Sequence, residues 1–194
     1  EINKLVFRKF EASTVRGDVQ LRDQKLVADP IRFSSMDGAV TGSAMIDARR
    51  SDTILITCDA SILKVNITKL FAELENFDQD AIQDKNLKGV LTADVKFASL
   101  WSAALHADMD KLYARGDIMI EKGELIGFEP LKALSEYIKV SELDHIRFST
   151  LKNEVEIKNR KVYLPVMDIE SSAMNISMSG THGFDDIVDY RFRI

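Results

Sequence analysis

The chain has 194 residues, a mass of 21.9 kDa and a formal charge of −5. Lys and Arg are dispersed one or two at a time, so the clusters that bind nucleic-acid phosphates are missing. No apolar run approaches the roughly 18 to 20 residues that span a bilayer, and no signal peptide opens the chain. Its 45% apolar residues suit one globular domain over residues 1–194. Because Glu1 already lies in a strand pattern, we expect this chain to be part of a longer protein.

The first strong pattern is "GDVQLRDQKLV" at 17–27, where apolar and polar residues alternate on either side of a short polar break. Alternation indicates a strand with one buried face, and such a break closes a tight hairpin. The pattern returns as "GDIMIEKGELI" at 116–126 and "NEVEIKNRKVY" at 153–163, so three hairpins are predicted. Arg-Gly-Asp precedes two of them, at 16–18 and 115–117. We interpret the tripeptide as the turn before a strand and not as an adhesion signal.

The segment after the first hairpin, 29–56, can be aligned with 165–194, so that Gly42 meets Gly180. A unit of hairpin, strand, Gly-containing turn and further strands therefore recurs, which is typical of β units stacked on a shared apolar surface. The single cysteine, Cys58, excludes an intrachain disulfide. It lies in the alternating run "ILITCDA", which predicts a small buried hydrophobe.

The period then changes. Residues 66–77, "NITKLFAELENF", place apolar residues on one helical stripe, with Asn66 as a candidate N-cap. Residues 75–86 are polar and acidic and predict a loop. Strand alternation resumes in "LKGVLTADVKF", whereas 99–112, "SLWSAALHADMDKL", is ambiguous and is predicted to be a loop.

A second amphipathic helix is predicted at 128–140, "FEPLKALSEYIKV", with Pro130 in the first turn, where proline is tolerated. Each helix would lay its apolar stripe on the sheet. Such a stripe is ordinary core if the helices fill the space over the sheet, and lines a ligand site if they do not. The sequence leaves both interpretations open.

Candidate catalytic groups do not converge in the sequence. His106, His145 and His182 have no second His, Cys or carboxylate at metal-ligand spacing. Ser179 lacks the Gly two residues before it that a nucleophile elbow requires, and no phosphate-binding glycine motif occurs. We therefore predict no enzyme activity, cofactor or metal. A hydrolase, the rival hypothesis, would need a Ser or an acid that converges on one of the three histidines.

The run at 116–138 strongly resembles the C-terminal region of the AsmA family of bacterial envelope proteins, with a Gly-x-apolar-x-apolar strand, a Lys-Gly turn, a short strand and a helix. The resemblance covers about 64–194, including "HIRFSTL" at 145–151, and residues 1–63 look like another β repeat of the same kind. It implies a periplasmic protein anchored in the inner membrane by an N-terminal helix absent from this chain. The family is linked to outer-membrane assembly. It is also similar to bridge-like lipid transfer proteins, whose curved sheets form an apolar trough for acyl chains.

Pattern and resemblance together predict an α+β, mostly β fold: a strongly curved antiparallel sheet of repeated hairpins with two or so amphipathic helices packed on it. The expected function is phospholipid or other acyl-chain handling by one segment of an envelope protein, since each buried methylene contributes about 0.8 kcal/mol. The residues expected to face the trough are Val19, Leu21, Leu91, Val95, Ile118, Ile120, Val155 and Ile157 from the strands and Phe71, Leu74, Leu131 and Leu134 from the helices. The alternative is a structural or protein-interaction module with a dry, filled interior, which would use its strand edges to dock neighbouring repeats of the parent protein.

Overall fold

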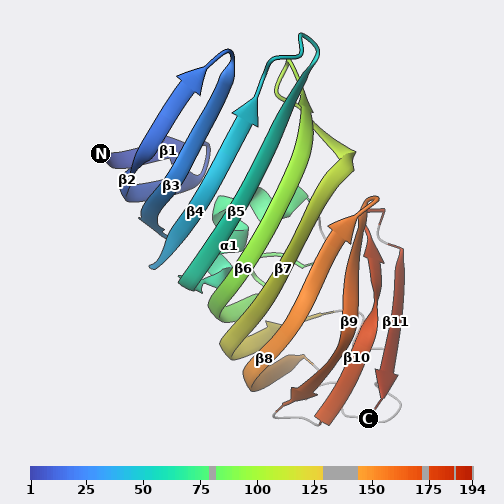
Figure 1. The fold of residues 1–194 in the computed structure, drawn as a ribbon. Helices are drawn as coiled ribbons and strands as arrows, with labels where there is room; N and C mark the ends of the chain where they lie inside the picture. The colour runs from blue at the N-terminus through green and yellow to red at the C-terminus, as the bar shows by residue number, and fades with distance from the viewer. Residues whose placement is uncertain (79–81, 129–143, 172–174, 186, 194) are drawn as a thin grey trace.

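A computed structural model describes residues 1–78, 82–128, 144–171, 175–185 and 187–193 (Figure 1). These ranges are mostly β, as the alternating patterns predict, with a single α-helix among the described residues. The elements in chain order are β1 (Ile2–Phe7), β2 (Phe10–Arg22), β3 (Lys25–Ser35), β4 (Gly38–Asp47), β5 (Thr53–Asn66), α1 (Ile67–Glu73), the 3-10 turn η1 (Glu75–Asp78), β6 (Leu87–Ser102), β7 (Ala107–Ile126), β8 (His145–Lys158), β9 (Lys161–Glu170), β10 (Asn175–Gly183) and β11 (Val188–Arg193).

All eleven strands form one open antiparallel sheet, in the order β1 to β11, so every strand pairs with its neighbours in sequence. This is the arrangement that the short connections predict. Three of the turns have positive φ at both central residues, the type I′ geometry whose twist suits a tight hairpin. These residues are Asp23 and Gln24, Met36 and Asp37, and Asn159 and Arg160.

The hairpins predicted at 17–27 and 153–163 are confirmed as β2–β3 and β8–β9. The hairpin predicted at 116–126 is wrong, because β7 runs without a turn to Ile126. Its polar break contains Lys122, with φ 52°, which lies at an irregularity of pairing with β6. A positive φ suits a bulge as well as a turn, and pairing with β6 on one side and β8 on the other continues the strand.

A similar irregularity occurs in β5, between Ile62 and Val65, and the one at Lys122 lies opposite Lys88 to Val90 of β6. Bulges bend the strand that contains them and increase its twist. Figure 1 shows β6 and β7 turning sharply near their lower ends, and α1 lying behind β5 and β6. The bulges give a local physical reason for this bend.

The helix predicted at 66–77 is confirmed in its first two turns. The side-chain oxygen of the Asn66 N-cap accepts a hydrogen bond from the Lys69 backbone N–H at 3.2 Å. The helix ends before the predicted end because Asn76 and Phe77 have φ of 56° each, outside the helical region.

Of the predicted loop 75–86, residues 75–78 form η1 and 82–86 form neither α-helix nor strand. The helix predicted at 128–140 lies outside the described residues except for Phe128.

The loop predicted at 99–112 is wrong. β6 continues through Trp101, which pairs with Ile54 of β5 and Ala107 of β7, so the connection is only a short turn. Ala is depleted in strands, but pairing with strands on both sides overrides that preference.

Both Arg-Gly-Asp tripeptides lie inside strands, at 16–18 in β2 and 115–117 in β7, so the prediction that they form turns before strands is wrong. The Gly-containing turn of the repeat is wrong in the same way, because Gly42 and Gly180 lie within β4 and β10.

The two aligned glycines, Gly42 and Gly180, nevertheless occupy equivalent positions in their strands. A Cβ on Gly42 would lie 2.0 Å from the Asp59 carbonyl oxygen of the following strand. A Cβ on Gly180 would lie 2.0 Å from the Asp189 carbonyl oxygen of the following strand. Both positions require glycine because the next strand approaches too closely for a side chain.

Candidate functional site

One face of the sheet carries consecutive apolar rows that run across the strands. The strand register places residues of β3 to β8 directly opposite one another, so the members of each row share a face. One row is Ile31, Gly42, Ala60, Val95, Gly116 and Val155. The next row on the same face is Ala28, Ala44, Cys58, Phe97, Ala114 and Ile157. We call these two rows the uncovered face, because α1, the only α-helix among the described residues, does not lie over most of them.

Helix α1 covers only one end of this apolar side. Ile67 and Leu70 of the helix pack into a buried cluster with residues from β5 to β8 and from the β3–β4 turn. The cluster consists of Met36, Val65, Ile67, Leu70, Leu91, Ala93, Ile120 and Phe148. Most members of the two rows are half-buried and outside this cluster, so a solvent-accessible apolar surface continues beyond the helix.

Part of the predicted trough lies in the covered end. Leu91 and Ile120 are 6% and 5% exposed and belong to the cluster under α1. Val95, Ile118 and Phe71 are half-buried and pack against that cluster. At this end of the sheet, Leu91 and Ile120 are core residues.

The other predicted residues are more accessible. Val155 and Ile157 are half-buried members of the two rows, on β8. Val19 and Leu21, near the end of β2, are 59% and 74% exposed. Leu74, at the α1 C-cap, is 37% exposed. Leu131 and Leu134 lie outside the described residues.

The trough residues predicted from the sequence did not include the small residues of the two rows. Gly42, Ala44, Ala60, Ala114 and Gly116 form what we call the small-residue floor. The signal was present in β4, where the apolar or small residues Val40, Gly42 and Ala44 alternate with Thr41 and Ser43. Short side chains leave more room above the sheet than the large residues expected there.

The opposite face is polar. Lys96 forms an ion pair with Asp59 at 3.4 Å, and Arg115 with Glu154 at 2.5 Å, each between neighbouring strands. These ion pairs are exposed, so each contributes little to stability but keeps the face hydrated. The two faces therefore differ sharply in polarity.

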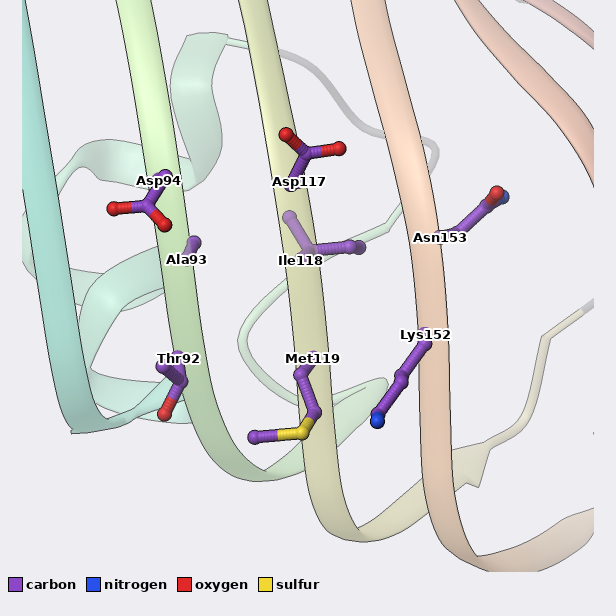
Figure 2. A pocket seen from close by; sticks show the side chains of 8 residues that line it. All are labelled: Thr92, Ala93, Asp94, Asp117, Ile118, Met119, Lys152 and Asn153. Atoms are coloured by element: carbon purple, nitrogen blue, oxygen red, sulfur yellow. The ribbon is translucent and has the colours of Figure 1, made fainter.

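A shallow depression over β6, β7 and β8 is drawn in Figure 2. It is lined by Thr92, Ala93, Asp94, Asp117, Ile118, Met119, Lys152 and Asn153. Asp94 and Asp117 lie directly opposite each other, and the Ser61 hydroxyl donates a 2.5 Å hydrogen bond to Asp94. Within the part of the chain that is described, no three His, Cys, Asp or Glu side chains are placed to hold a metal ion.

A second depression lies between α1 and the β2–β3 hairpin. The Glu73 carboxylate accepts hydrogen bonds from the Glu11 backbone N–H at 3.2 Å and the Ser35 hydroxyl at 3.4 Å. Lys69 pairs with Asp37 at 2.6 Å and, chiefly by donating that hydrogen bond, lowers the pKa of the Asp37 carboxyl. These contacts hold α1 onto the sheet.

The three histidines lie in separate places. His106 is exposed in the β6–β7 turn, and His145 contacts Glu124 at 2.9 Å, where its hydrogen bond lowers the pKa of the Glu124 carboxyl. His182 Nδ1 lies 2.8 Å from the Tyr190 hydroxyl, and burial raises the pKa of Tyr190 to about 12. Ser179 and His182 are an odd number of positions apart on β10, so their side chains point to opposite faces. This geometry does not assemble a serine–histidine pair.

Cys58 lies in the second apolar row, half-buried. Burial raises the pKa of its thiol, so the nucleophilic thiolate is disfavoured. Its environment is that of a small hydrophobic residue.

No family model, curated protein or solved structure matches the chain. Among the described residues, no helix is both long and apolar enough to cross a membrane.

Proposed function

We propose that this chain is a non-catalytic segment of a bacterial envelope protein that holds acyl chains of phospholipid, or of another lipid, on its uncovered face. The observation that carries the proposal is the pair of apolar rows crossing β3 to β8, opposite a charged face. An acyl chain placed there would lose its contact with water, and each buried methylene contributes about 0.8 kcal/mol. The small-residue floor provides room for the chain.

The proposal includes a strongly curved sheet of repeated hairpins with two amphipathic helices over its apolar side. The bulges in β5 and β7 support such curvature, and α1 supplies one helix. The segment 128–140 is proposed as the second. The periplasmic location, the inner-membrane anchor of the parent protein and the role in outer-membrane assembly rest on the AsmA-like pattern of residues 64–194.

The test uses two neighbouring residues on opposite faces of β5. Ala60 belongs to the small-residue floor, and Ser61 is exposed on the polar face. Protein purified from bacteria is examined by native mass spectrometry, followed by lipid extraction. We expect lipid bound to the wild type and to Ser61→Arg, and loss of lipid from Ala60→Arg, because a charge in the floor opposes an apolar ligand.

Wild-type protein free of lipid and unable to bind added phospholipid would refute the proposal. Equal binding by both variants would place the lipid elsewhere. Circular dichroism of each variant checks that the sheet is retained.

A protein-interaction module is the second candidate, favoured by the edge strand β1. Ile2, Val6 and Phe7 are 49%, 59% and 64% exposed there, on a strand that pairs only with β2. Exposed apolar edges invite pairing with another strand. Lipid-free protein that self-associates, and becomes monomeric in Val6→Lys, would support this function instead.

A further inference from the structure

Two buried polar atoms on the apolar face of β6 have no hydrogen-bond partner among the described residues: Ser99 Oγ and Trp101 Nε1. Ser99 is 1% exposed and Trp101 is half-buried. Both are an even number of positions from Phe97 of the uncovered face, and the β5–β6 pairing is regular here, so all three side chains share that face. The two atoms lie at the end of β6 away from α1.

Unpaired buried donors are rare, because a buried polar group that makes no hydrogen bond reduces stability. The strand register places Ser99 opposite Ile56 and Trp101 opposite Ile54, so the neighbouring side chains on β5 offer no acceptor. An acceptor from outside the chain would satisfy both groups.

The chemistry of the Ser99 hydroxyl and the Trp101 indole N–H limits which chemical groups can be that acceptor. The indole N–H of Trp101 donates only, and the Ser99 hydroxyl can donate as well. An ammonium group is excluded as a partner for the indole because it carries donors only. A carbonyl oxygen at the end of a hydrocarbon chain meets both requirements, since it accepts hydrogen bonds and its chain is apolar.

We propose that Ser99 and Trp101 bind the carbonyl oxygen of an acyl chain whose hydrocarbon lies on the small-residue floor. This inference rests on the proposed function and adds the orientation of the ligand. From Trp101 to Val95 the strand extends about 20 Å at roughly 3.3 Å per residue, which leaves room for a long chain beside it. A free fatty acid and a glycerolipid ester both supply the oxygen.

Access to Ser99 requires a neighbouring side chain to move, because the residue is 1% exposed. Trp101 is two residues away and is the only tryptophan in the chain, so its fluorescence reports the site without background. Binding is expected to change its emission.

The experiment compares ligands that differ at the carbonyl. Palmitoyl lysophosphatidylcholine has an ester carbonyl, and hexadecylphosphocholine has the same headgroup on an alkyl chain. Palmitic acid tests the free-acid source. All three ligands are titrated into the full chain below their micelle concentrations, and binding is followed by Trp101 emission. Displacement of an anilinonaphthalene dye is a second measure of binding, which can also be used for the variant that lacks tryptophan.

Ser99→Ala and Trp101→Phe should each weaken binding of a carbonyl ligand about 3- to 10-fold, the value of one neutral hydrogen bond. If the variants lose affinity for palmitic acid only, the ligand is the free acid. If they lose affinity for the lysolipid only, the ligand is an ester. Hexadecylphosphocholine should bind both variants as it binds the wild type. Ser61→Ala, on the polar face, is the matched control and should leave the affinity for every ligand unchanged.

Ser99→Ala should also leave the thermal midpoint unchanged or raise it, because an unpaired hydroxyl is removed. A lower midpoint would mean that the hydroxyl has a partner within the protein, and would overturn the carbonyl site. Unchanged affinities in both variants, with all ligands bound, would overturn it while the acyl-chain function stands. Binding of no ligand at all would refute both the proposed function and this site.

Discussion

Truncating predicted trough residues should have very different costs at the covered end and at the edge of the apolar side. Ile120 is 5% exposed and packs in the cluster that contains Leu91 and Phe148. Ile120→Ala removes buried methylenes and leaves a cavity, so it should reduce the free energy of unfolding by about 2–5 kcal/mol. Leu21 is 74% exposed, so roughly a quarter of it is shielded from water. Because full burial of a leucine contributes about 1.5–3 kcal/mol, Leu21→Ala should cost less than about 1 kcal/mol.

Urea unfolding followed by circular dichroism measures both changes, provided that the slope of free energy against denaturant stays constant. A loss for Leu21→Ala as large as that for Ile120→Ala would mean that this part of β2 is covered in solution. A loss below about 1 kcal/mol for Ile120→Ala would mean that α1 does not cover the core. Either result would refute the division of the apolar side into an end covered by α1 and an exposed remainder.

Three further changes test local features. Asn66→Ala removes the N-cap of α1 and should cost about 0.5–2 kcal/mol in urea unfolding, whereas Asn66→Ser, whose hydroxyl can still cap the helix, should keep most of that stability. Gly42→Ala places a Cβ 2.0 Å from the Asp59 carbonyl oxygen and should cost about 1–3 kcal/mol, against under about 0.5 kcal/mol for Ser43→Ala on the other face; equal costs would contradict the close approach. Burial raises the pKa of Tyr190 from 10.0 to about 12, so neutral Tyr190 stabilises the fold fully below pH 10 and loses that contribution as the pH rises through 12. Thermal midpoints should therefore fall more steeply over this range in the wild type than in Tyr190→Phe, and parallel curves would exclude Tyr190 as the cause.

Local sequence was a good guide where the local backbone decides the structure. The polar breaks at 22–25 and 158–161 close hairpins because their central residues adopt positive φ. Asn66 caps α1 because a side chain three residues before a backbone N–H reaches it from the same turn.

Prediction from local sequence was wrong where one local pattern is compatible with two different structures. Lys122 has the positive φ of a turn residue but forms a bulge, since β6 and β8 hold β7 on both sides. Around Trp101 the sequence pattern is ambiguous and a loop was predicted, but pairing with β5 and β7 makes a strand. In both places the outcome depends on strands distant in sequence.

The amino-acid pattern alone was enough to predict which side chains share a face, because a strand points successive side chains to opposite faces whatever it pairs with. It also determined the one-after-another order of the strands, because short connections leave few other arrangements. Which part of the apolar side α1 covers could be seen only in the folded chain. Leu91 and Val155 have the same strand pattern, yet Leu91 is buried in the cluster under α1 and Val155 is half-buried outside it. Burial depends on what packs over a residue, and the helix that packs here contacts only one end of the sheet.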